Sequence, residues 1–372
     1  MKKRNKTFII FSPAFPLGEE DSTWVPWLQT IVAALNNNFP GLNVIVFAFQ
    51  YPYTTKAYSW HNNKILPFNG YYKNKVTRFL MWMNIFIEVR KIKKHSDIVG
   101  IFSQWCTECT FVAKYIAKFL ELKYYCWVLG GDARETNTYV KRIRPEPSLL
   151  IAISDFVVDE FYRSHGIRPQ HVIPTGIDIS LFDSSKQEKD IDVIGVGALS
   201  VLKQYDLFVE IVAKLKEDLP GIKTMICGDG TEREYIDGMI KELGVGENLT
   251  VTGFIPHKES LKMMQRARIL LHPSSYEGFG TVCLEALYAG AHVISFVQPM
   301  YCEIRNWHIV KTKEEMQLKA LELLQDPNTK YESVLPYTTD DAVKKVLKLF
   351  GYSTEPIDDN KPKAFSKTNS GV

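Results

Sequence analysis

Apolar positions along the chain follow two different periods. Short runs rich in Ile, Val and Phe predict buried strands, and they alternate with amphipathic stretches that predict helices. This alternation is typical of βαβ units built around a parallel sheet. A first series of predicted strands covers 7–11, 43–49, 97–102, 124–129 and 149–153, with helices beginning near residues 26, 71, 107 and 135. A second series covers 191–196, 222–227, 249–252, 268–271 and 292–295.

Two such series in succession predict an α/β protein with two doubly wound, Rossmann-like domains, a division that a length of 372 residues also favours. Between the series, Gly, Ser, Asp, Lys and Gln replace the apolar periodicity over 174–189. We therefore expect one domain at 1–178 and a second at 179–337. Residues 338–352 predict a terminal helix with an acidic first turn, and the polar residues 353–372 predict a disordered tail.

Composition excludes several classes of protein. With 45% hydrophobic and 23% charged residues the chain can bury a core, and a net charge of +3 is too small to indicate a nucleic-acid partner. Six dispersed cysteines without a secretory signal predict a reducing, cytoplasmic location. Cys106 and Cys109 have the C-x-x-C spacing, but no second pair follows, so buried thiols are favoured over a metal or redox site.

Charge is distributed unevenly between the two halves. Residues 1–178 hold 22 Lys and Arg against 14 Asp and Glu, whereas 179–372 hold 23 against 28. Much of the excess lies in 71–95, where basic residues accompany many large apolar ones. Two interpretations stay open for this segment: a basic amphipathic helix on the inner face of the cell membrane, or a core-facing helix with a solvated basic end.

The segment 271–295 carries the most informative motif. A strand ends near Leu271, a Gly-containing loop follows, and a helix begins near Gly280. Backbone N–H groups at such a helix start carry partial positive charge and suit a phosphate. Glu277 lies in the loop, while Glu285 lies in an apolar stretch of the helix, where a carboxylate needs a polar partner.

The spacing Glu277-x7-Glu285, with its surroundings, resembles glycosyltransferase family 4, the retaining nucleotide-sugar transferases of the GT-B fold. Segments that also resemble the family are 151–155, 173–178, 197–203, 227–233 and 251–255. The resemblance extends over about 149–295 and is weak in the first 130 residues. It implies two Rossmann-like domains with a cleft between them, an acceptor site in the first domain, and a terminal helix that packs back on that domain.

The resemblance also implies roles for individual residues. Glu285 would accept hydrogen bonds from the nucleotide ribose, Glu277 would contact the transferred sugar, and Lys203 would neutralise the departing diphosphate. The backbone of Gly278, Phe279, Gly280 and Thr281 would hold the sugar or distal phosphate, Gly253, Phe254 and Ile255 would line the base pocket, and Gly228 belongs to a Gly-rich turn. No metal is implied, because Asp190-x-Asp192 is expected merely to open a strand.

Three departures from the family pattern stand out. Ala198 replaces a usual Arg, Gly18 is a single glycine where the family pairs two, and Leu129 occupies the approximate place of a usual His. Asp132 is the nearest polar replacement for that His, and an equally weighted alternative makes it a turn or cap residue. His272 and His292 are expected to serve packing.

Together these features predict a retaining, metal-independent hexosyltransferase that needs no cofactor. Its partners would be a UDP- or GDP-type sugar donor and a glycan or lipid-linked acceptor, in cell-surface polysaccharide or glycolipid assembly. The alternative is a degenerate GT-B scaffold that binds nucleotide or a protein without turnover, motivated by Ala198 and Leu129. A nucleotide-sugar epimerase of similar fold is disfavoured, because the Glu-x7-Glu loop matches the transferases better.

Overall fold

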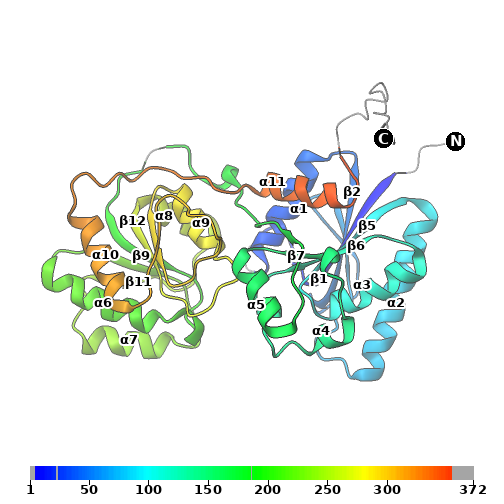
Figure 1. Cartoon of the computed structure of the whole chain (residues 1–372), viewed down its shortest axis with the longest axis horizontal. Coiled ribbons are helices and arrows are strands. Elements are labelled where there is room, and N and C mark those ends of the chain that lie inside the picture. The colour runs from blue at the N-terminus through cyan, green and yellow to red at the C-terminus, as the bar shows by residue number, and fades with distance from the viewer. Residues whose placement is uncertain (1–4, 22–23, 186, 354–372) are drawn as a thin grey trace, which may run out of the picture.

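The computed structural model describes residues 5–21, 24–185 and 187–353, which form two α/β domains side by side (Figure 1). Each domain has its own sheet, with eight strands in the first and six in the second. The first sheet ends with β8 (His171–Val172) and the second begins with β9 (Ile191–Val196). Of the predicted tail 353–372, all but Ser353 lies outside the described residues.

The first sheet has the order β3-β4-β2-β1-β5-β6-β7-β8. Its strands run parallel except for the antiparallel pair β3 and β4. Their bounds are β1 Lys6–Ala14, β2 Leu42–Tyr51, β3 Tyr58–Trp60, β4 Asn63–Pro67, β5 Asp97–Gln104, β6 Tyr124–Val128 and β7 Leu150–Ala152. The helices are α1 Pro26–Asn38, α2 Lys75–His95, α3 Glu108–Leu120, α4 Thr138–Ile143 and α5 Asp155–His165.

Strand β1 shows why these runs are apolar at every position. Phe8 and Ile10 belong to the core on one face of the sheet, whereas Ile9 and Phe11 belong to the core on the other face. All four side chains are fully buried. A parallel sheet covered by helices on both faces needs apolar residues on both sides of each central strand, so the uninterrupted apolar run follows from the architecture.

The second sheet is entirely parallel, with the order β11-β10-β9-β12-β13-β14. Its remaining strands are β10 Thr224–Cys227, β11 Leu249–Val251, β12 Ala267–His272, β13 His292–Ser295 and β14 Trp307–Ile309. Its helices are α6 Tyr205–Asp218, α7 Arg233–Glu242, α8 His257–Arg266, α9 Thr281–Tyr288 and α10 Lys313–Gln325. The strand order reverses between β9 and β12, and open α/β sheets bind ligands beyond the carboxyl ends of strands at such a point.

Helix α11 (Thr339–Leu349) returns from the second domain to the first, where it lies along α1 (Figure 1). The Phe350 ring just after it packs edge-on against Phe8 and Tyr125, with centroids 5.0 and 4.9 Å away. The Asn38 side-chain amide donates a hydrogen bond of 2.6 Å to the carboxylate of Asp340. Helix α11 and Phe350 therefore anchor the two domains to each other.

Some elements differ from the predicted ones. The hairpin β3–β4 and strands β8 and β14 were not predicted, because each is short and carries too few apolar residues to show a period. The predicted helix near residue 71 begins at Lys75, after Asn74 caps it with its side chain. The helix expected near residue 135 is only the single short α4.

Candidate active site

A cavity of about 320 Å³ lies between the two domains, at the strand-order reversal of the second sheet. The first turns of α1 line one side of it, and the connector after β8 lines another. The second domain contributes the segment after β9 and the loop that joins β12 to α9. The residues that line it include Trp27, Ala198, Lys203, His257, Glu277, Gly280, Thr281 and Glu285.

The β12–α9 loop ends in a sharp turn at Gly280, whose φ of 80° is left-handed. Glycine adopts this conformation without strain, and a Cβ there would lie 3.3 Å from Sγ of Cys283. Because Gly280 has no side chain, it cannot cap the first N–H groups of α9. Gly280 and Thr281 line the cavity, so the uncapped, positive end of the helix borders it and suits an anion.

Glu277 lies between two nitrogen groups at the base of this loop. Its carboxylate forms an ion pair with Nζ of Lys203 and lies 3.2 Å from Nε2 of His272. Burial alone would raise the pKa of Glu277, but the neighbouring His272 and the charge of Lys203 outweigh it and lower the pKa to about 2. Burial lowers the pKa of His272 itself. At neutral pH the carboxylate is ionised and its histidine neighbour is neutral.

Glu285 has the polar partner that its apolar surroundings demand. Its Oε1 lies 2.7 Å from Nε2 of His257, which begins α8. Burial would lower the pKa of His257, but the hydrogen bond and charge of Glu285 together raise it. Both side chains line the cavity. The sequence offered no signal for His257, because it is 28 residues from Glu285 and belongs to a separate helix.

The Gly-rich turns bring two strand ends of the second sheet into close contact. Gly228 follows β10, and a Cβ at this residue would lie 1.9 Å from the carbonyl oxygen of Gly197. Gly228 also forms an isolated bridge with Gly253. Only glycine fits at this close approach, and the backbone after β9 that Gly228 contacts borders the cavity.

Several predicted site residues lie outside the cavity lining. Phe254 is 64% exposed, and Phe279 is buried against the rings of Trp307 and Tyr337. Gly278 packs against the first domain, where the Ser154 hydroxyl donates to its carbonyl. The other predicted residues outside the lining are Gly18, Gly228, Gly253 and Ile255. The cavity thus gathers Lys203, Glu277, Gly280, Thr281 and Glu285 from the predicted set.

Asp132 does not line the cavity either. It is 3% exposed, and its carboxylate accepts hydrogen bonds from the backbone N–H groups of Cys106, Leu129 and Gly130, at 2.6, 2.9 and 3.0 Å. Burial raises its pKa to about 6, although these hydrogen bonds oppose the change. This position fits the turn interpretation of Asp132 rather than a contact with reacting groups. The turn in question packs against the second domain, since the hydroxyl of Tyr276 donates to Gly130.

Two further expectations can be compared with the structure. Ala198 lines the cavity, and Lys203 is the only Lys or Arg among the described residues that do so. His272, expected to serve packing, is buried but also contacts Glu277.

Within the described ranges, no group of three or more His, Cys, Asp or Glu side chains could hold a metal ion. Over those same ranges, no helix has both the length and the apolar character needed to cross a bilayer.

Comparisons with solved structures identify the architecture. A TarM mutant from S. aureus, solved with fondaparinux, α-GlcNAc-glycerol and UDP, matches with a TM-score of 0.69 at 10% identity and covers 93% of this chain and 100% of its own. HepE from Anabaena, solved with UDP and glucose, matches with a TM-score of 0.63 at 15% identity over 92% of this chain and 94% of its own. This chain has the GT-B fold.

Sequence comparisons concentrate on the second domain. Residues 177–334 match the family model described as glycosyl transferases group 1. The 2-deoxystreptamine N-acetyl-D-glucosaminyltransferase of Niallia circulans is 32% identical over 103 residues, which are 28% of this chain and 26% of that protein. The gpi3 subunit of the phosphatidylinositol N-acetylglucosaminyltransferase of Schizosaccharomyces pombe is 27% identical over 165 residues, 43% of this chain and 36% of that subunit. The chain thus spans well under half of these relatives.

Proposed function

We propose that this GT-B protein is a metal-independent retaining glycosyltransferase of family 4. It transfers a sugar from a UDP- or GDP-type donor to an acceptor hydroxyl, in cell-surface polysaccharide or glycolipid assembly. One observation carries the proposal: a single interdomain cavity collects Lys203, Glu277, Glu285 and the start of α9. A cation, two carboxylates and a helix N-terminus are the groups that a nucleoside diphosphate sugar needs.

The donor is oriented by groups of opposite charge at separate points of the cavity. Glu285, held by His257, accepts hydrogen bonds from the ribose hydroxyls. The diphosphate lies against the uncapped start of α9 and the ammonium group of Lys203. Glu277 then faces the sugar, where its ionised carboxylate accepts hydrogen bonds from the hydroxyls.

Lys203 gains a second anionic partner when the donor binds. In the free protein its ammonium group pairs with Glu277, and an arriving diphosphate offers it a second anion. As the bond between sugar and phosphate lengthens, negative charge grows on the leaving oxygen, and Lys203 and the α9 dipole stabilise it. Positive charge grows on the sugar ring, and the carboxylate of Glu277 stabilises that charge.

The first domain contributes the aromatic ring of Trp27 to the cavity. Trp27 lines the cavity, and its ring lies 5.4 Å from Trp105 in an edge-on arrangement. The apolar face of a sugar ring packs well on an indole ring, so Trp27 suits a glycan acceptor. With both domains around the reaction, water is kept from the reacting carbon.

Nucleotide binding is the first test. A thermal-shift panel of UDP, GDP, ADP and their sugars should show a higher melting temperature for one diphosphate and its sugar. UDP is the first to try, since HepE was solved with it. Glu285→Gln should weaken binding about 10-fold or more, because a charged acceptor is replaced by a neutral one. Glu259→Gln, an exposed change on α8, is the matched control.

Turnover is the second test. The protein, incubated with the donor that binds, should release free diphosphate slowly with water and faster with an acceptor glycan. The anomeric configuration of the product, read by NMR, should match the donor, and EDTA should leave the rate unchanged. Nucleotide binding without any release would favour the degenerate scaffold, and no binding by any nucleotide would overturn the proposal.

A further inference from the structure

Helix α2 lies at the outer end of the first domain, away from the second domain (Figure 1). One stripe of the helix is buried against the sheet: Met81, Ile85 and Val89. This stripe belongs to the core that α2 and α3 cover together. The helix thus packs on the domain through this stripe.

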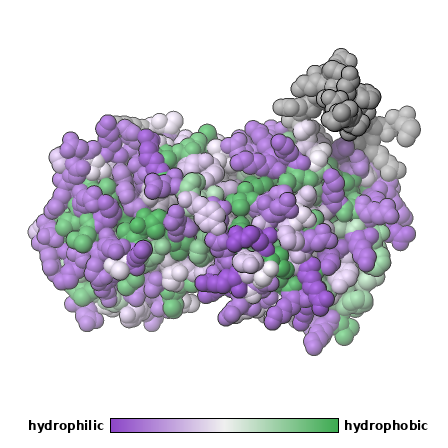
Figure 2. All heavy atoms as spheres, in the orientation of Figure 1, coloured by the Kyte–Doolittle hydropathy of each residue, from purple (hydrophilic) through white to green (hydrophobic). Residues whose placement is uncertain are grey.

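A second apolar stripe runs along the opposite side of the same helix. Val76, Phe79, Leu80, Met83 and Ile87 are each between 43% and 69% exposed. At 100° per residue these positions lie about 180° from the buried stripe. A surface helix of a globular protein normally carries polar residues on that side. Figure 2 shows apolar residues at the surface in this region.

Exposed aromatic rings extend this stripe beyond α2. Phe119, near the end of α3, is 73% exposed, and its ring lies 6.3 Å from Phe86. Before the first turn of α2, Tyr72 is 83% exposed and contacts the rings of Tyr71 and Tyr53. We call the exposed side of α2 with these rings the α2 face. Contiguous apolar surface of this kind marks an interaction site.

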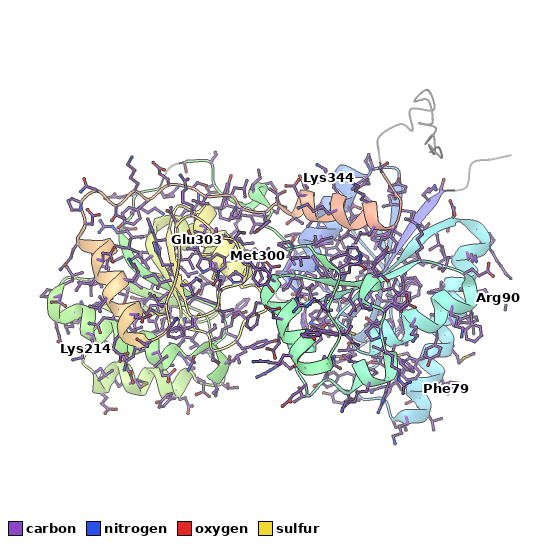
Figure 3. The ribbon with its side chains drawn as sticks, in the orientation of Figure 1. Phe79, Arg90, Lys214, Met300, Glu303 and Lys344 are labelled. Atoms are coloured by element: carbon purple, nitrogen blue, oxygen red, sulfur yellow. The ribbon has the colours of Figure 1, made fainter. Side chains whose placement is uncertain are left out.

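The charged residues that flank the exposed apolar stripe of α2 are positive. Lys75 flanks its start, while Arg90 and Lys94 continue the exposed stripe into the last turns. Among the described residues no carboxylate is within ion-pair distance of these three side chains. Glu88, the single acidic residue of the helix, pairs with Lys91. Figure 3 places Phe79 and Arg90 toward opposite ends of α2.

We propose that the α2 face docks on the surface of an anionic phospholipid bilayer. Its side chains Phe79, Leu80 and Met83 enter the boundary between headgroups and acyl chains, with the tyrosines at headgroup level. Lys75, Arg90 and Lys94 contact the phosphate groups. An apolar centre with aromatic flanks and unopposed basic residues complements a negatively charged lipid surface, whereas a protein partner would have to supply both an apolar groove and acidic residues.

The test is flotation of the full chain with vesicles. Phosphatidylcholine vesicles with about a third phosphatidylglycerol should carry the protein at low salt, and pure phosphatidylcholine vesicles should carry much less. Phe79→Ser with Leu80→Ser should lower the partition coefficient at least about 10-fold through lost apolar burial. Arg90→Gln with Lys94→Gln should lower it about 5-fold per charge, and high salt should act similarly.

Matched controls separate this face from general stickiness. Leu318→Ser changes an exposed apolar residue of α10, and Lys344→Gln with Lys345→Gln changes two exposed lysines of α11. Both helices lie away from α2 (Figure 1). These variants should float like the unchanged protein. Because every changed side chain is exposed, melting temperature should stay unaltered in all variants.

Three outcomes would overturn the proposal. One is the absence of flotation with anionic vesicles at low salt. Another is an equal loss of flotation in the α2 and control variants. The third is a dimer in solution, measured by light scattering, that the Phe79→Ser and Leu80→Ser changes dissociate, since the α2 face would then bind a second copy of the chain.

Discussion

Replacing Glu277 with Gln removes one negative charge from the cavity and keeps the size of the side chain. The carboxylate is 16% exposed, pairs with Lys203 and lies 3.2 Å from Nε2 of His272. Gln can still accept a hydrogen bond from either group, so the change isolates the charge. We expect lower stability, because the charge is already stabilised in the free protein.

The magnitude follows from the pKa of Glu277, which folding lowers from 4.5 to about 2. Each pKa unit corresponds to about 1.4 kcal/mol. His272 is neutral at pH 7 and adds no full charge, so we expect Glu277→Gln to cost about 2 to 3 kcal/mol. Because the folded pKa lies below the unfolded one, this contribution is complete above pH 4.5 and falls by about 1 kcal/mol at pH 3.5.

Urea unfolding followed by circular dichroism at pH 7 and pH 3.5 measures both quantities. Glu259→Gln is the control, because its carboxylate forms an exposed pair with Lys262 in the same domain. An exposed pair contributes less than about 1 kcal/mol. If Glu277→Gln unfolded at the same urea concentration as the unchanged protein at pH 7, the charge would not stabilise the site and the reasoning from its pKa would be refuted.

Three further predictions concern other parts of the molecule. Lys203→Met should lower kcat by about 30-fold to 1000-fold, measured as diphosphate release, because the leaving group loses its cation. Asp132→Ala should cost about 2 kcal/mol in urea unfolding, because three backbone N–H groups lose their acceptor, and nucleotide binding should not change. Phe350→Ala should cost about 3 kcal/mol through a cavity between α11 and the first sheet, read as a lower melting temperature.

A different result would contradict each of these predictions. If Lys203→Met released diphosphate with an unchanged kcat, Lys203 would not be the cation that stabilises the leaving diphosphate. For Asp132 the pH dependence is also informative: its folded pKa of about 6 lies above the unfolded 3.8, so its contribution grows as pH falls from 7 to 5, by about 1 kcal/mol. If the difference in free energy of unfolding between the unchanged protein and Asp132→Ala became smaller as pH falls from 7 to 5, the raised pKa of Asp132 would be contradicted. Phe350→Leu, which keeps most of the volume, should recover much of the stability that Phe350→Ala loses.

Periodicity and turn chemistry were sufficient for the local elements of the site. The strand that ends at His272, the turn at Gly280 and the helix from Thr281 are all encoded within one short segment. Glu277 and Glu285 belong to that segment, so their positions on either side of the start of α9 follow from local structure, whereas the cavity that they line also needs the first domain. The fold class followed in the same way, since the order of apolar runs predicts two doubly wound sheets and the structure has them.

Contacts between distant segments were beyond the reach of the sequence. The pairing of His257 with Glu285 depends on how α8 packs beside α9, and the burial of Asp132 depends on the turn that closes over it. Short strands such as β14 exist only because a neighbouring strand offers a free edge. In each case the interaction joins residues far apart in the sequence, whereas apolar periodicity depends only on residues a few positions apart.

Helix α2 shows the division most clearly. Its sequence determined a helix with many apolar and basic residues, because a helix depends on neighbours within a few positions. Whether the apolar residues lie in the core or face outward depends on which side of the helix the sheet covers, and the residues of α2 that are buried there are Met81, Ile85 and Val89. The sequence by itself determined the elements and the charges, and the tertiary structure decided which side chains are exposed, because exposure depends on atoms contributed by the rest of the chain.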